Sequence, residues 1–123
     1  MTSESRAFVA WVSGQLVQQR TTESISEASD GERFFFADGA GNAAPTRPAA
    51  ERACGVRRDG ATSNYCLRDP QGGEHICLSL YGRLLEGFAH GSDSHFNGFV
   101  DDGAVTLYDF AESDYFTYRL AER

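Results

Sequence analysis

Residues 64–80 read NYCLRDPQGGEHICLSL, and the strand pairing of the predicted sheet follows from this segment. Two short β-forming segments flank residues 70–73, Pro-Gln-Gly-Gly, whose composition is typical of a tight turn. If that turn is the tip of a hairpin, Cys66 lies opposite Cys77, the apolar side chains share one face and the polar ones share the other. Two pairs form the apolar face: Tyr65 with Leu78, and Leu67 with Ile76. Such a clean separation predicts an antiparallel hairpin in this register.

The same reasoning extends to the C-terminus. Asp102-Gly103 is a strong two-residue turn signal, and it places Val100 opposite Val105. Turns at residues 91–94 and 111–114 then pair His90 with His95 and Phe110 with Tyr115. The last pairing predicts Leu107 opposite Tyr118 and Val105 opposite Leu120. Residues 63–121 are therefore predicted to form a six-strand antiparallel meander with one aliphatic face and one aromatic and polar face.

The N-terminal half is expected to add a helix and one strand. Residues 1–20 place Phe8, Val9, Val12 and Leu16 at helical spacing, with Thr2 or Ser3 as the cap. Residues 21–30 are polar and predict a solvated connection or a weak helical extension. The Phe-rich segment 32–37 predicts a strand, and residues 38–52, rich in Ala, Gly and Pro, predict a flexible loop.

The expected fold is α+β and mainly β. The N-terminal helix packs on a strongly bent antiparallel meander of about six to seven strands, with closure into a small barrel as an alternative. A chain of 123 residues fits one domain spanning residues 1–123. The sequence leaves open which face of the sheet is the core.

Composition narrows the classes of function and location. No segment approaches the roughly 20 apolar residues of a membrane span, and the start of the chain is a poor secretory signal, so we expect a cytoplasmic protein. All eleven basic residues are arginine, which excludes lysine-based catalysis and suggests a bacterial or phage source. The net charge of -7 argues against direct binding of nucleic acid or an anionic membrane.

The negative charge is concentrated in the C-terminal half. Residues 84–118 contain seven carboxylates and no arginine or lysine. Solubility and protection of sheet edges explain such a pattern as readily as a binding role does. Beside aromatic side chains, however, the carboxylates suit a partner that presents Arg or Lys, through cation–π contact and electrostatic steering.

The leading hypothesis is therefore a small, acidic, non-enzymatic domain that binds a basic surface of a protein partner. One form of it is an inhibitor or immunity-type protein that imitates nucleic acid; no cofactor and no catalytic residues are expected. The predicted partner-binding residues are Phe99, Asp101, Asp102, Tyr108, Asp109, Phe110, Glu112, Asp114 and Tyr115. A purely structural subunit, whose aromatic face is buried by its own helix or by self-association, is a further possibility.

Histidines support an alternative hypothesis of a different class. All three are predicted at the same end of the meander, close to acidic residues, where imidazole can bind a transition metal or act as an acid or base. This metal-dependent or acid/base protein would use His75, His90, Asp93 and His95. Histidines at the wet ends of strands also need no special explanation.

Three cysteines complete the set of reactive side chains. Cys66 and Cys77, predicted across one hairpin, could form a disulfide, a redox switch or part of a metal site with Cys54. The simpler interpretation is two small, half-buried thiols that fill the sheet, because the chain has no C-x-x-C pair. An odd number of widely spaced cysteines also fits a reducing compartment.

Overall fold

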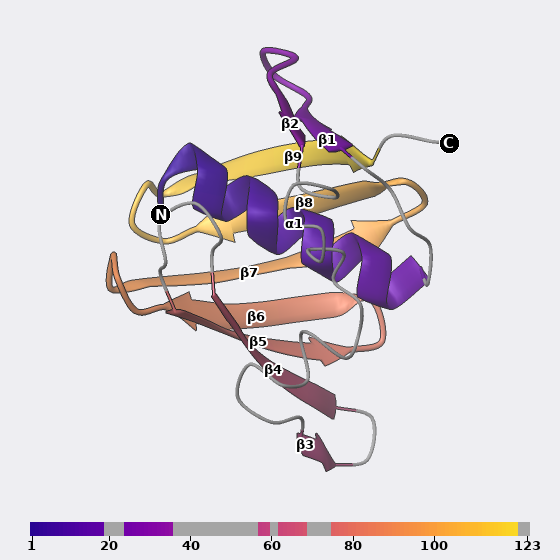
Figure 1. The fold of residues 1–123 in the computed structure, drawn as a ribbon, viewed down its shortest axis with the longest axis vertical. Coiled ribbons are helices and arrows are strands. Elements are labelled where there is room, and N and C mark those ends of the chain that lie inside the picture. Colours follow the sequence, from indigo (N-terminus) through magenta and orange to yellow (C-terminus); the bar gives the residue numbers. More distant parts are fainter. Residues whose placement is uncertain (19–23, 36–56, 60–61, 69–74, 121–123) are drawn as a thin grey trace.

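One helix and nine strands make up the described part of the computed structural model, which comprises residues 1–18, 24–35, 57–59, 62–68 and 75–120 (Figure 1). In chain order the elements are α1 (Ser3–Gln18), β1 (Ser24–Glu27), β2 (Arg33–Phe35), β3 (Arg57–Asp59), β4 (Thr62–Arg68), β5 (His75–Tyr81), β6 (Leu84–Ala89), β7 (Ser94–Asp101), β8 (Ala104–Asp109) and β9 (Asp114–Leu120). The fold is α+β and mainly β, as predicted.

All nine strands belong to one antiparallel sheet, in the order β2-β1-β9-β8-β7-β6-β5-β4-β3. The strands from β3 to β9 form the meander, and the β1–β2 hairpin extends the sheet beyond β9. Its two edge strands, β2 and β3, do not pair with each other, so the sheet is open and the small-barrel alternative is not realised (Figure 1).

The hairpin of β4 and β5 has the predicted register. Cys66 pairs with Cys77, Tyr65 with Leu78 and Leu67 with Ile76. Val100 also pairs with Val105, as the Asp-Gly turn signal predicted. Because the side chains of a strand alternate between faces, these pairings place the aliphatic residues together on one side of the sheet.

Two later turns begin one residue earlier than predicted. His95 pairs with Phe88 rather than His90, and Tyr115 pairs with Tyr108 rather than Phe110. The same shift pairs Val105 with Tyr118, and it pairs Leu107 with Phe116. Both turns span four residues and end in a left-handed residue, Asp93 or Ser113, each with φ of 55°. Since each shift is two positions in register, the residues still lie on the predicted faces.

A buried carboxylate explains the turn at residues 110–113. Asp109 Oδ1 accepts a hydrogen bond from the Ala111 amide at 3.0 Å, and the Asp109 carbonyl accepts one from the Ser113 amide at 2.8 Å. These bonds end β8 at Asp109 instead of Phe110. Asp109 is therefore a structural residue on the helix-covered face, and its side chain is fully buried.

Helix α1 lies across one face of the sheet and contacts β1, β7, β8 and β9 (Figure 1). The Thr2 hydroxyl accepts a hydrogen bond from the Ser5 amide at 3.1 Å, which confirms the predicted cap. Trp11 is completely buried, and so are Val105 and Leu107 of the sheet. Each such aliphatic side chain stabilises the fold by about 1.5–3 kcal/mol, so the aliphatic face is the core.

A charged group lies inside this core. Asp109 Oδ2 is 3.1 Å from the Arg6 guanidinium and 3.1 Å from the Met1 ammonium, and all three groups are almost fully buried. The Arg6 guanidinium also lies 3.8 Å from the centre of the Phe116 ring. The ion pairs therefore tie the start of the helix to the end of β8.

The N-terminal half contains two differences from the sequence analysis. Ser24–Glu27, within the predicted solvated connection, forms strand β1, which pairs with β9. Ile25 is 1% exposed because it belongs to the core that α1 covers. Strand β3 was not predicted, because Arg57–Asp59 has no apolar alternation. The predicted loop 38–52 lies outside the described residues.

Candidate functional site

The sheet face opposite α1, called here the outer face, bears the aromatic and polar side chains of the meander. Phe99, Phe110 and Tyr115 are 44%, 51% and 67% exposed. The helix thus covers the aliphatic side and leaves these rings in water, which rules out burial of the aromatic face by the chain's own helix. Exposed aromatic side chains in contact with one another are typical of interaction surfaces.

Three rings at the turn end of β8 and β9 form an aromatic cluster of Tyr108, Phe110 and Tyr115. The Tyr108 ring lies 4.9 Å from the Phe110 ring and 4.7 Å from the Tyr115 ring, both edge-on. Tyr108 and Tyr115 are directly opposed across the two strands, and Phe110 is the first residue of the turn between them. Edge-on contacts of this kind hold the rings in place, so the cluster presents a preorganised apolar surface.

A shallow depression of about 520 Å³ adjoins the cluster, with Phe110 in its wall. On the outer face its lining includes Phe88, Asn97, Ser79, Cys77, His95 and Glu86. The Tyr81 hydroxyl donates a hydrogen bond to the Glu86 carboxylate, and this bond raises the pKa of Tyr81. Aromatic walls beside a carboxylate form a site whose chemistry suits a flat or elongated cation.

The predicted partner-binding carboxylates fall at opposite ends of the strands. Glu112 and Asp114 are exposed beside the aromatic cluster, whereas Asp101 and Asp102 are exposed at the far end of β8, about 17 Å away at the usual rise per residue. Asp109 belongs to neither set, because it is buried against Arg6 under the helix. The nine residues proposed from the sequence therefore do not form one continuous surface.

Only one of these two ends is uniformly acidic along β7 to β9. At the far end, Arg83 Nη1 is 3.9 Å from Asp101 Oδ1, and Arg119 is exposed opposite Ala104. Around the aromatic cluster, the turn contributes Glu112 and β9 contributes Asp114, without an arginine in either element at that end. The exposed charges that β8, β9 and their turn contribute at the cluster end are therefore all negative, whereas Arg6 and the Met1 ammonium at that end are buried against Asp109 on the opposite face.

The three histidines share one end of the sheet, as predicted, but they have different partners. His75 Nε2 accepts a hydrogen bond from Arg68 at 2.6 Å, His90 Nε2 is 3.4 Å from Cys77 Sγ, and the His95 ring packs on Phe88 at 4.6 Å. Within the described residues, His75, His90, Asp93 and His95 do not gather into a metal-binding group. The metal hypothesis consequently has no ligand cluster among these four side chains.

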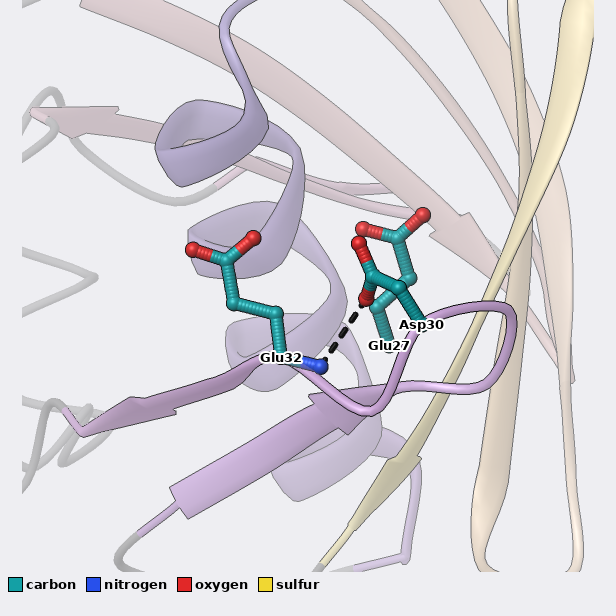
Figure 2. A group of neighbouring side chains, drawn as sticks. All are labelled: Glu27, Asp30 and Glu32. Atoms are coloured by element: carbon teal, nitrogen blue, oxygen red, sulfur yellow. Dashed lines mark hydrogen bonds between the residues drawn. The ribbon is translucent and has the colours of Figure 1, made fainter.

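The described residues contain one group of acidic side chains that are close enough to share an ion: Glu27, Asp30 and Glu32, in the turn between β1 and β2 (Figure 2). Asp30 Oδ1 accepts a hydrogen bond from the Glu32 amide at 2.9 Å (Figure 2). Glu27 Oε2 accepts one from the Ser29 hydroxyl at 3.0 Å. These are ordinary turn-forming contacts. They account for the position of the group without a ligand.

The sequence analysis favoured two free, half-buried thiols at Cys66 and Cys77, and the structure differs from this at Cys66. Cys77 is a free thiol, but Cys66 is disulfide-bonded, so the two residues are not a matched pair of thiols. Their sulfur atoms are 3.8 Å apart and are not bonded to each other. Cys54, the proposed third ligand, lies outside the described residues.

Sequence reasoning missed the depression and the contact between Cys77 and His90. Glu86, Phe88 and Asn97 were not singled out, because their importance depends on three neighbouring strands. A repeat of twenty residues in the sequence could have revealed these neighbours. Three cross-strand pairs follow this spacing: Arg68 with His75, Phe88 with His95, and Tyr108 with Tyr115. Extending the first hairpin's register by that spacing gives both later turns correctly.

Comparison with protein-family models, with curated proteins and with solved structures finds no match to this chain. Within the described residues, α1 lacks the length and apolar character required to cross a bilayer. The chemistry of the outer face is therefore the basis for a functional proposal.

Proposed function

We propose that the chain is a small binding domain whose outer face engages a basic surface of a protein partner, with the aromatic cluster and the adjoining depression as the centre of contact. The observation that supports this proposal is the exposure of Phe110 and Tyr115, in ring contact with Tyr108, at the uniformly acidic end of β8 and β9. Aromatic anchors at the centre and charge at the rim are the usual anatomy of an interface.

A cationic partner fits the chemistry better than an apolar one. The depression combines the faces of Phe88 and Phe110 with the carboxylate of Glu86, and a guanidinium can stack on the former while it pairs with the latter. Each partly exposed cation–π contact contributes about 0.5–1 kcal/mol. A second copy of the chain fits poorly, since Glu112 and Asp114 would then approach like charges.

The proposal includes a narrower form, in which the basic surface is a groove that otherwise binds nucleic acid. Such a groove presents spaced arginines or lysines, and the net charge of -7 favours its approach over long distances. This form makes an additional prediction: a short DNA duplex competes with the domain for the same partner.

A defined small-molecule probe tests the site before any partner is identified. We expect titration with N-acetylarginine amide to shift the amide NMR signals of residues lining the depression and the aromatic cluster, with weak affinity that falls as salt is added. N-acetylglutamine amide, which has no charge, is the matched control. Equal shifts with both compounds, or shifts confined to Asp101 and Asp102, would contradict the proposal.

Paired variants then test the same surface against a protein partner. Phe110→Ser combined with Tyr115→Ser removes the two exposed anchors, and we expect at least a tenfold loss of affinity because each anchor contributes about 1 kcal/mol or more. Leu84→Ser combined with Phe99→Ser is the control, since these exposed side chains pair with each other at the far end of the sheet. Equal losses in both double variants would refute the assignment of the site.

A further inference from the structure

Two histidines pack against Phe88, the ring of β6 that lines the depression on the outer face. The His95 ring lies 4.6 Å from the Phe88 ring, and the two residues are directly opposite each other across β6 and β7. The His90 ring lies 4.8 Å from the same ring and meets it edge-on. Of the three histidines, each of which the structure describes, His95 alone lines the depression. The ring on which we expect a cationic side chain to stack is therefore in contact with a titratable neighbour.

Protonation of His95 would place a positive charge in the depression itself. Imidazole ordinarily changes its charge between pH 5 and 8, and the His95 side chain is exposed, so it exchanges protons freely with water. Glu86 lies two residues before Phe88 on the same face, and it is a diagonal neighbour of His95, with Cα atoms about 7–8 Å apart. An imidazolium at residue 95 would thus lie on the Phe88 ring and near Glu86, where a ligand's guanidinium is expected.

The charged and titratable groups around His95 come from several elements. They are Cys77 on β5, Glu86 on β6, His90 and Asp93 in the turn after β6, Tyr108 on β8 and Glu112 in the turn after β8. Arg68 lies three strands away on β4, where it is bonded to His75. Among the groups that surround His95 in the described part of the chain, the two imidazoles are therefore the ones that become positively charged in mild acid.

We propose that protonation of His95 closes the depression to cationic ligands. While the imidazole is neutral, the Phe88 ring and the Glu86 carboxylate are both available to a guanidinium. In mild acid, the imidazolium lies against that ring, repels the ligand's charge and is itself attracted to Glu86. This inference rests on the proposed function, because it describes how the same site is regulated.

The direction and size of the effect follow from the two charges. Binding is intact while His95 is neutral, and it weakens as the pH falls through the range in which imidazole takes up a proton. Two like charges about 6 Å apart at a partly exposed surface repel each other enough to weaken binding by about fivefold or more. His90 meets the edge of Phe88 and lies outside the lining of the depression, so we expect its protonation to contribute less.

Titration with N-acetylarginine amide at pH 7.5 and pH 5.5 tests this regulation on the intact chain. We expect the affinity, measured from the amide NMR signals of the lining residues, to be lower at pH 5.5 by about fivefold or more. Equal affinities at the two pH values would overturn the regulation and leave the proposed function standing. Failure of the compound to bind at pH 7.5 would contradict the proposed function, and the regulation with it.

Three variants then assign the effect to His95. His95→Gln cannot be protonated, so its affinities at the two pH values should agree within about twofold, whereas His95→Arg carries a permanent charge and should bind weakly at both. His75→Gln is the matched control, because His75 is exposed at the same end of the sheet but is bonded to Arg68 outside the depression. We expect it to lose affinity in acid as the parent protein does. Equal losses in His95→Gln and His75→Gln, or parental affinity of His95→Arg at pH 7.5, would overturn the role of His95.

Discussion

Asp109→Asn tests whether the buried charges hold the helix on the sheet. The substitution preserves the size of the side chain and its Oδ1 atom, which accepts the Ala111 amide, but it removes the negative charge. Arg6 and the Met1 ammonium, each 3.1 Å from Asp109 Oδ2, then remain buried without their counter-ion. Breaking a buried ion pair in this way costs about 3–5 kcal/mol.

The expected loss lies at the lower end of that range. Arg6 keeps a hydrogen bond to the Met1 carbonyl at 2.7 Å and its contact with the Phe116 ring, and each of these contributes about 1 kcal/mol. We therefore expect the free energy of unfolding to fall by about 3 kcal/mol. For a domain of this size the midpoint of thermal unfolding should fall by about 10 °C.

Urea denaturation followed by circular dichroism measures the change. Asp114→Asn is the matched control, because Asp114 pairs directly with Asp109 across β8 and β9 but is exposed. An exposed substitution of this kind should change stability by less than about 0.5 kcal/mol. If Asp109→Asn cost less than about 1 kcal/mol, or no more than the control, the ion pairs would have no part in holding the fold together.

Two further predictions concern backbone space and high pH. Gly98→Ala should lower the free energy of unfolding, measured in urea, by about 3 kcal/mol, because a Cβ atom would overlap the Thr106 carbonyl on the neighbouring strand. Gly103→Ala is the control: a Cβ atom there would lie in open space, and the φ of 76° should cost about 1 kcal/mol. Equal losses of stability in the two variants would refute the close approach at Gly98. Burial raises the pKa of Tyr118 from 10.0 to about 12, with Arg6 opposing the shift. The folded state therefore holds this proton more tightly, so its contribution to stability is intact below pH 10 and is lost as pH rises towards 12, by at most about 2–3 kcal/mol. Urea midpoints at pH 9 and 11 should show this decline in the parent protein and a smaller one in Tyr118→Phe; parallel declines would contradict the assignment.

The predicted binding surface illustrates how far sequence reasoning extends. Alternation along each strand correctly separated Phe99 and Tyr108 from Val100 and Leu107, because side-chain direction has a period of two residues. The same alternation places Asp109 on the aliphatic face with Leu107, so its inclusion among the partner-binding residues was wrong. The sequence could not show that Arg6, 103 positions away, meets Asp109 on that face. Nor could it show that Asp101 has Arg83 beside it, while β8, β9 and their turn expose no arginine near Glu112.

Three local features could be predicted from the sequence alone: the helix with its Thr2 cap, the hairpin that aligns Cys66 with Cys77, and the division of each strand into two faces. These features depend on turn chemistry and on short-range periodicity, which neighbouring residues fully specify. Three other features became evident from the folded chain: which face the helix covers, the position of Ser24–Glu27 in the sheet beside β9, and the contact between Cys77 and His90. Each of these depends on contact between elements distant along the chain, where burial in the assembled core overrides local preference.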